Sequence, residues 1–380
     1  MLIRNTLVAA LMGAAAILPA NAQGYDVEVL AEGLDRPWGM EFLPGGRDIV
    51  ITSRGGSLML WDAAVGEIRS LDGTVDVDTR GQGGLLDIAL APDFAESGIV
   101  YLTWSANTGN GLTTTTLGRG VLDLDAGALR DVETLFQVSP AMDSQAHYGS
   151  RIAVQDGFVY VSTGDRNQKD FGPDHIAQDL SSENGAVLRL ALDGTIPDDN
   201  PFVGQDGASG AIWSYGHRNI QALAFDPSDG QLWLAEHGEA GGDEINRVER
   251  GGNFGWPLVG YGVDYRTGQP FADLPSADDP YIAPAFNWPP GRENHFPPSG
   301  MAFYDGDAFG DWQGNMFIGG LYQQFLARFS VEDGKIEMQE RLLDGMGYRI
   351  RDVAAGPEDG LLYVLTDGEG APLLRLSPTD

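Results

Sequence analysis

The sequence predicts an all-β protein, a six-bladed β-propeller of four-stranded antiparallel blades, because one short unit recurs six times. In each copy a short apolar strand leads through a turn rich in Pro, Asp or Gly into a second, strongly β-forming strand. Apolar runs of about five residues between turn signals are typical of half-buried antiparallel strands, whereas sustained helical spacing is hard to find. Since one blade cannot bury both of its faces alone, the copies are expected to stack around an axis. They span residues 37–53, 84–105, 149–165, 219–238, 298–320 and 348–368.

Residues 23–380 are interpreted as a single domain, because no change of composition and no linker divides them. Ring closure is expected to pair a strand near residues 25–30 with the last strands, near residues 373–376. The chain is longer than bare blades of roughly 40 to 50 residues require, so the surplus must form loops. It is concentrated in residues 164–210 and 236–298, which are rich in Gly, Pro, Asp and Asn. Such loops either build a site on the rigid scaffold or are solvated insertions.

The composition excludes several classes of function. The chain carries 55 acidic and 23 basic residues, a net charge of −32, so its field repels the phosphate backbone of nucleic acids. Because it contains no cysteine, it can form no disulfide, no zinc–thiolate site and no cysteine nucleophile. Its five histidines show no metalloprotease spacing, and no Gly-x-Ser-x-Gly motif indicates a serine hydrolase.

Residues 1–22 have the pattern of a cleavable signal peptide. Arg4 provides the positive end, residues 7–18 an apolar run, and residues 20–22 a small-x-small cleavage site. The alternative is a membrane anchor, but the run is shorter than the roughly 20 residues needed to cross a bilayer. We therefore expect a periplasmic or secreted protein without a membrane span.

His147 and Asp165 are the first candidate site residues. His147 opens the third repeat and Asp165 closes its second strand, so a short hairpin would bring the two side chains together. An imidazole oriented by a carboxylate is a general base suited to removing a proton from a hydroxyl near neutral pH. The alternative is structural, with His147 hydrogen-bonded at a blade edge and Asp165 forming a turn.

Arginines recur at the mouths of different repeats. Arg218 and Asn219 open the fourth repeat, and Arg349 and Arg351 open the sixth. Because alternate side chains of a strand share one face, Arg349 and Arg351 are expected to point the same way, with Ile350 turned to the core. If the arginines converge on the central funnel, they suit a small polycarboxylate, which forked guanidiniums bind bidentately. The alternative is that each pairs with a neighbouring Asp or Glu.

Besides the His147 cluster and the two arginine clusters around Arg218 and Arg349, there is a fourth cluster, residues 236–244. It combines carboxylates with glycine-rich turns and is followed by the segment 253–257. Carboxylate and carbonyl oxygens are the donors that Ca²⁺ prefers. The spacing does not match an EF-hand, so an acidic surface loop is the alternative.

In this order, the four clusters resemble the soluble quinoprotein aldose sugar dehydrogenases, relatives of soluble glucose dehydrogenase and sorbosone dehydrogenase that use pyrroloquinoline quinone (PQQ) and calcium. The resemblance runs from Pro37-Trp38-Gly39 to Asp352. Its most specific pieces are residues 216–219, 242–246, 253–257 and 349–351.

The resemblance implies an aldose substrate, whose C1 hydroxyl is oxidised to a lactone by proton abstraction at His147 and hydride transfer to PQQ assisted by calcium. Asp165 would orient His147. The residues implied to contact the cofactor are Gln82, Arg218, Asn219, Arg349 and Arg351, with Tyr265 lining the same pocket. The carbonyls of Gly238 and Glu239 would hold the calcium that polarises the quinone, and Glu244 and the carbonyl of Phe254 a second, structural calcium.

Two positions depart from the family pattern. Gly238-Glu239 stands where Gly-Pro is common, a change of little consequence if only the carbonyl binds calcium. Tyr322 stands in a segment where sugar-oxidising members carry a lysine, and a phenol cannot replace an ammonium as a partner of the quinone.

Two other functions are compatible with the sequence. One is a calcium-dependent hydrolase of the lactonase type, and the other is a non-catalytic propeller that binds sugars or proteins. The particular sugar, the soluble electron acceptor and the choice between monomer and homodimer are left open.

Overall fold

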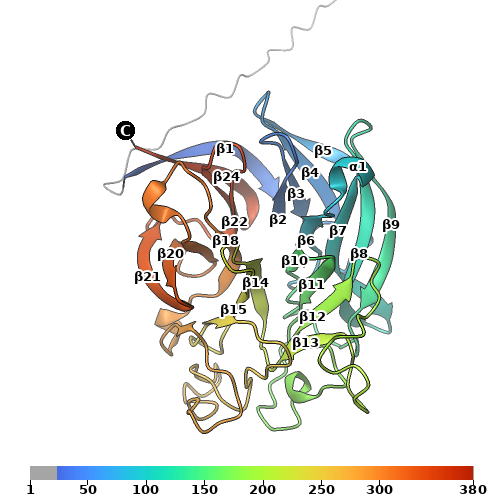
Figure 1. The fold of residues 1–380 in the computed structure, drawn as a ribbon, viewed down its shortest axis with the longest axis vertical. Helices are drawn as coiled ribbons and strands as arrows, with labels where there is room; N and C mark the ends of the chain where they lie inside the picture. The colour runs from blue at the N-terminus through green and yellow to red at the C-terminus, as the bar shows by residue number, and fades with distance from the viewer. Residues whose placement is uncertain (1–23, 380) are drawn as a thin grey trace, which may run out of the picture.

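The structure, a computed structural model, describes residues 24–379. The predicted signal peptide, residues 1–22, lies outside the described residues. The described chain is all-β and forms antiparallel sheets around a common centre, as in a β-propeller (Figure 1). Among residues 24–379, no helix is long and apolar enough to cross a membrane.

The N-terminal part of the ring is an eight-stranded sheet made of two antiparallel halves. The first half contains β2 (Pro37–Phe42), β3 (Ile49–Ser53), β4 (Ser57–Asp62) and β5 (Glu67–Thr74). The second contains β6 (Leu85–Leu90), β7 (Ile99–Gly109), β8 (Leu112–Asp123) and β9 (Ala128–Gln137), with the short helix α1 (Phe94–Ser97) between β6 and β7. One parallel bridge, Asp72 to Ala128, joins the halves.

Four-stranded sheets complete the ring. One contains β10 (Ile152–Gln155), β11 (Phe158–Ser162), β12 (Ala186–Ala191) and β13 (Ile212–Tyr215). The next contains β14 (Ile220–Phe225), β15 (Leu232–Glu236), β16 (Glu244–Arg247) and β17 (Phe286–Asn287). Another contains β18 (Pro298–Phe303), β19 (Met316–Gly320), β20 (Leu326–Glu332) and β21 (Lys335–Leu342). The last contains β22 (Ile350–Ala355), β23 (Leu362–Thr366), β24 (Glu369–Pro378) and β1 (Tyr25–Asp35). Short 3-10 helices lie at Ile176–Gln178, Arg292–Asn294 and Gly310–Trp312.

The predicted ring closure is confirmed, because β1 pairs antiparallel with β24 through Val27 opposite Leu376 and Val29 opposite Leu374. The first strand of each repeat lies nearest the centre of the ring (Figure 1), and each of these strands contacts the next around the ring. In ring order they are β2, β6, β10, β14, β18 and β22.

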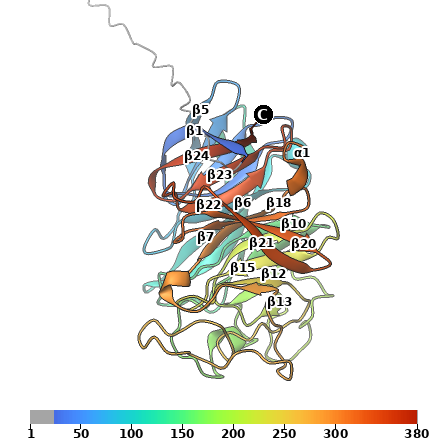
Figure 2. The same cartoon turned by 90° about the vertical axis from the view of Figure 1, so that its left-hand side faces the viewer.

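The hydrophobic core lies between the faces of adjacent sheets. Ile49 and Ile51 of β3, for example, pack with Tyr363 and Leu365 of β23, and all four are fully buried. This explains why the strands are apolar on both faces near the axis, since each inner strand is covered by neighbours on two sides. The loop between β16 and β17 extends from one end of the molecule, the lower end in Figures 1 and 2.

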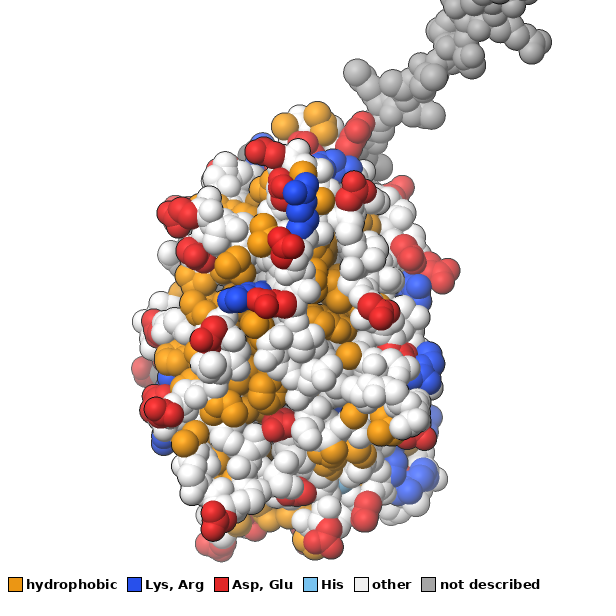
Figure 3. Space-filling model, turned by 90° about the vertical axis from the view of Figure 1, so that its right-hand side faces the viewer, with side chains coloured by type: hydrophobic (Ala, Val, Ile, Leu, Met, Phe, Trp, Pro, Cys, Tyr) orange, Lys and Arg blue, Asp and Glu red, His pale blue; other side chains and the backbone are white. Residues whose placement is uncertain are grey.

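The outer surface carries charged side chains of both signs. On the face drawn in Figure 3 acidic side chains outnumber basic ones and are scattered among apolar side chains, as expected for a chain with a net charge of −32. Guanidinium groups are nevertheless buried near the axis.

Arg151, directly before β10, joins inner strands of several sheets at the axis. Its side chain is 4% exposed, and Nη1 lies 3.2 Å from Asp87 of β6 and 3.1 Å from Asp352 of β22. Nε donates to the carbonyl of Gln221 in β14 at 2.9 Å, and Nη2 to the carbonyl of Arg351 at 2.7 Å. One guanidinium therefore satisfies acceptors on three inner strands that are distant in the sequence.

Replacing this guanidinium should destabilise the whole ring. Arg151→Met leaves the buried Asp87 and Asp352 carboxylates without their shared cation, which should lower the free energy of unfolding by about 3–5 kcal/mol. Urea denaturation measures the change. The matched control is Arg130→Met, because the Arg130 side chain is 55% exposed and lies 3.4 Å from Asp123; its expected cost is below about 1 kcal/mol. Equal costs for the two variants would contradict this role of Arg151.

Candidate functional site

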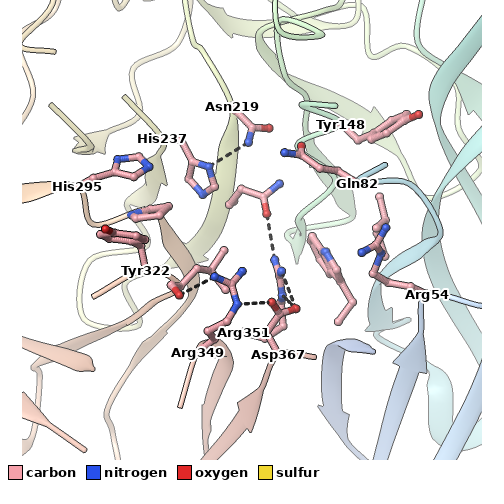
Figure 4. Close-up of a pocket in the computed structure, with 15 residues that line it drawn as sticks. Arg54, Gln82, Tyr148, Asn219, His237, His295, Tyr322, Arg349, Arg351 and Asp367 are labelled. Atoms are coloured by element: carbon pink, nitrogen blue, oxygen red, sulfur yellow. Dashed lines mark hydrogen bonds and ion pairs between the residues drawn. The ribbon is translucent and has the colours of Figure 1, made fainter. Parts of the chain in front are cut away.

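A cavity of about 380 Å³ opens at one end of the axis, above the inner strands. Side chains from several sheets converge on it (Figure 4). Its polar lining comprises Arg54, Gln82, Asn219, Gln221, His237, His295, Arg349, Arg351 and Asp367. Aromatic rings come from Trp38, Tyr148 and Tyr322.

Arg349 and Arg351 point into this cavity together, as the alternation of side chains along a strand predicts. Arg349 Nε donates to Asp367 Oδ2 at 2.8 Å, and Arg351 Nη2 donates to Asp367 Oδ1 at 2.9 Å. Ile350 between them is fully buried in the core. Two guanidiniums thus share one carboxylate, so this wall of the cavity carries an excess of positive charge.

Arg218 does not line the cavity, so its expected convergence with Arg349 and Arg351 is not found. Its Nη2 donates to Glu239 Oε2 at 2.6 Å, and Lys169 Nζ lies 2.6 Å from the same oxygen. Burial alone would raise the pKa of Glu239, but Arg218 and Lys169 outweigh it and hold that pKa below its usual value. The Arg218 guanidinium is thus engaged by the Glu239 side chain, which was given no role from the sequence, and by the carbonyl of His237 at 3.1 Å.

His147 and Asp165 form the predicted pair. The distance between His147 Nδ1 and Asp165 Oδ1 is 2.6 Å, and Trp256 Nε1 donates to the other carboxylate oxygen at 2.9 Å. Since a carboxylate accepts at Nδ1, the neutral imidazole carries its proton there and keeps the Nε2 lone pair. His147 has a backbone φ of 53°, a region that few residues other than glycine adopt and that is enriched at functional sites.

His147 lies beside the cavity rather than in its lining. Its backbone N–H donates at 2.7 Å to Oε1 of Gln82, which lines the cavity. Burial lowers the pKa of His147 below 6.5, assisted by the charge on Arg218 and opposed by Asp165. The imidazole is therefore neutral and oriented at neutral pH, which is the state a general base requires.

Asn219 and His237 line the cavity as a hydrogen-bonded pair. His237 Nε2 donates to the carbonyl of Pro298 at 2.9 Å, so Nδ1 is the acceptor for Asn219 Nδ2 at 3.3 Å. Burial lowers the pKa of His237 well below its ordinary value, which keeps the ring neutral. The sequence analysis included His237 in a cluster but assigned it no function.

Tyr265 reaches the cavity only through a neighbour. Its hydroxyl lies 3.0 Å from Nε2 of His295, and His295 lines the cavity. Tyr322 lines it directly, is 59% exposed, and has its ring centroid 6.0 Å from that of His295.

The four candidate calcium ligands lie around a second, smaller cavity of about 20 Å³. Its lining includes Gly238, Glu239, Glu244 and Phe254, together with Glu236. Within residues 24–379 no three Asp, Glu or His side chains converge as a metal site, so any cation here would need backbone carbonyls as well.

The donors of this smaller cavity suit a cation. Burial raises the pKa of Glu244 well above 4.5, and the charge on Glu236 raises it further. Asn246 Nδ2 donates to Glu236 at 3.1 Å and to Glu244 at 3.3 Å, while its buried Oδ1 has no partner among the described residues. Two neighbouring carboxylates in a buried place would be stabilised by a hard cation.

Comparisons with known proteins identify the family of this chain. The model of the glucose/sorbosone dehydrogenase family matches residues 34–375. The chain is 42% identical over 358 residues to the aldose sugar dehydrogenase YliI of Escherichia coli, covering 93% of each protein.

Solved structures give the same result. The apo-form of the soluble aldose sugar dehydrogenase from Escherichia coli superposes with a TM-score of 0.85 at 41% identity, covering 93% of this chain and 100% of that one. The PQQ-bound aldose sugar dehydrogenase from Streptomyces coelicolor has a TM-score of 0.75 at 28% identity, covering 94% of this chain and 99% of that one. The resemblance seen in the sequence is confirmed: the chain belongs to the glucose/sorbosone dehydrogenase family.

Proposed function

We propose that this protein is a PQQ- and calcium-dependent dehydrogenase that oxidises the C1 hydroxyl of aldose sugars to lactones. The observation that carries the proposal is an oriented, neutral imidazole, His147 held by Asp165, beside a cavity walled by guanidiniums. We further propose that the ring is a six-bladed propeller and that residues 1–22 direct it to the periplasm. The relatives named aldose sugar dehydrogenase support the substrate class.

The cavity residues fit PQQ, a flat anion with three carboxylates. Arg349 and Arg351 offer forked donors for carboxylates, and the amides of Gln82 and Asn219 offer neutral hydrogen bonds. The buried ring of Trp38, which is stacked against Arg151, forms an apolar part of the cavity wall. The chemistry of the donors, rather than the overall charge of the chain, makes this a site for an anion.

His147 performs the proton transfer in this proposal. Its Nε2 lone pair takes the proton of the C1 hydroxyl, and Asp165 stabilises the imidazolium that forms through the 2.6 Å hydrogen bond to Nδ1. PQQ, when bound, supplies an electrophilic carbonyl that accepts the two electrons of the alcohol. Gln82, which accepts from the backbone of His147, fixes the distance between the base and the cavity.

Calcium would be held by the oxygens around the smaller cavity. We propose Glu244 and the carbonyl of Phe254 for a structural ion, and the carbonyls of Gly238 and Glu239 for an ion that serves the cofactor. Support for the structural ion comes from the neighbouring carboxylates of Glu236 and Glu244, which both line the smaller cavity. The carbonyl of Glu239 already accepts from Val263 N–H at 2.8 Å and retains a second lone pair.

Reconstitution tests the activity. Purified protein loaded with PQQ and Ca²⁺ should reduce a dye when an aldose is added, and His147→Gln should lower kcat by about 10²–10⁴-fold while leaving the Kd for PQQ within about threefold. The Kd is the control for folding, since the variant must still bind. No PQQ binding and no dye reduction with any aldose would remove the proposal. Lactone hydrolysis that needs metal but no quinone would indicate the hydrolase instead, and sugar binding without turnover a binding protein.

The pH profile of kcat/KM should report the lowered pKa of His147. Since the base works only when neutral, and its pKa lies below 6.5, the rate should stay high as pH falls from 8 to 6.5 and decline only below that. An acidic limb with its midpoint above pH 6.5 would contradict this assignment.

Calcium should stabilise the protein through Glu244. Because the raised pKa means that the calcium-free folded protein holds this proton more tightly than the unfolded chain does, stability falls as pH rises from 4.5 through the raised value. Ca²⁺ at pH 8, where Glu244 gives up this stabilising proton, should raise Tm, because a ligand at 100 times its Kd adds about 2.7 kcal/mol to the free energy of unfolding. Glu244→Gln should abolish this rise, whereas Glu249→Gln, at an exposed position nearby, should keep it. An unchanged calcium response in Glu244→Gln would exclude the site.

A further inference from the structure

We propose that Arg54 is a ligand for the anionic cofactor and binds one of its carboxylates from the side of the cavity opposite Arg349 and Arg351. This inference rests on the proposed function. Arg54 follows β3, in the turn before β4, and was not among the residues that the sequence singled out. It lines the cavity, and Figure 4 shows Arg54 and Arg349 on different sides of Asp367.

The guanidinium of Arg54 is held in place without being neutralised. Nε donates to the carbonyl of Gly83 at 2.9 Å, and Nη2 donates to the carbonyls of Gly81 at 2.5 Å and Gly83 at 2.7 Å. Carbonyls fix the plane of the fork but carry no net charge. Within residues 24–379 Arg54 forms no ion pair, whereas Arg349 and Arg351 share Asp367. In a chain with 55 acidic residues, a cation left without a carboxylate in a cavity marks a place for an external anion.

The turn of residues 81–84, whose carbonyls accept from Arg54, packs closely against the Arg54 backbone. A Cβ at Gly84 would lie 2.4 Å from the carbonyl oxygen of Arg54 and 2.8 Å from its Cβ. Only glycine permits so close an approach of the two chain segments. The same turn carries Gln82, which lines the cavity and accepts from the backbone of His147. The turn of residues 81–84 therefore positions both Arg54 and the candidate base His147.

The electrostatics of the cavity also require an anion. Burial lowers the pKa of Arg54, and repulsion from Arg351 and Arg36 lowers it further; the charge on Asp367 opposes this shift but does not reverse it. The lining contains three arginines and one carboxylate, Asp367. A carboxylate placed between Arg54 and Arg351 would remove their repulsion and accept from both.

Arg54 adds a cation to a cavity from which Arg218 is absent, because Arg218 is engaged by Glu239. Arg54 restores a third cation beside Arg349 and Arg351, from a different sheet. The cavity therefore offers three guanidiniums to a tricarboxylate.

Absorbance titration of the calcium-loaded protein with PQQ tests the inference by affinity alone, without turnover. Arg54→Gln should raise the Kd for PQQ at least about tenfold, because a charge-assisted hydrogen bond is lost. Arg54→Lys, which keeps the charge but not the fork, should fall between Arg54→Gln and the parent. The matched control is Arg47→Gln, which removes the same charge at the other end of β3, where the Arg47 side chain is 44% exposed and lies 3.8 Å from Asp359; its Kd should equal that of the parent.

The outcomes separate this inference from the proposed function. If the parent does not bind PQQ, the proposed function fails. If the parent binds and Arg54→Gln binds equally well, Arg54 is not a ligand. If Arg54→Gln does not fold, as judged by circular dichroism, Arg54→Met keeps the apolar stem and must show the same loss. An equal loss of affinity in Arg47→Gln would reduce the effect to overall charge and overturn the assignment.

Discussion

The bond network of Arg151 is the constraint on which the fold and the site both depend. Its guanidinium joins Asp87, Asp352 and backbone carbonyls at the axis, so inner strands of different sheets are held at fixed distances. The same guanidinium lies 4.1 Å from the centre of the Trp38 ring. Because it is buried, water does not compete for its hydrogen bonds. Arg151 also donates to the carbonyl of Arg351, so the hydrogen-bond network at the axis directly positions a residue of the cavity wall.

A second connection ties the long loops to the candidate base. Asp165 accepts from His147 on one oxygen and from Trp256 on the other, so the loop after β11 and the loop after β16 meet at one carboxylate. The ring of Trp256 packs edge-on against Phe171, with centroids 5.6 Å apart. The loops that sequence analysis identified as surplus are thus structured around the site, which favours a functional role over solvated insertions.

Local patterns in the sequence were sufficient for part of this structure. The pairing of β1 with β24 followed from the repeat, the His147–Asp165 contact from the length of a hairpin, and the shared direction of Arg349 and Arg351 from the alternation of side chains along a strand. Each of these depends on neighbouring residues or on a regular repeat.

Contacts between distant loops could not be predicted in the same way. Arg218 was expected at the funnel, but its direction is decided by Glu239 in another loop, with Lys169 in a third. Arg54 was overlooked because its importance comes from the Gly81 and Gly83 carbonyls, which its own repeat does not contain. Diffraction from crystals soaked with PQQ and Ca²⁺ tests the central claim most directly. The account predicts the quinone in the axial cavity, between Arg54 and Arg351, with Nε2 of His147 facing its reactive edge; a quinone bound elsewhere, or an empty cavity at saturating concentration, would contradict it.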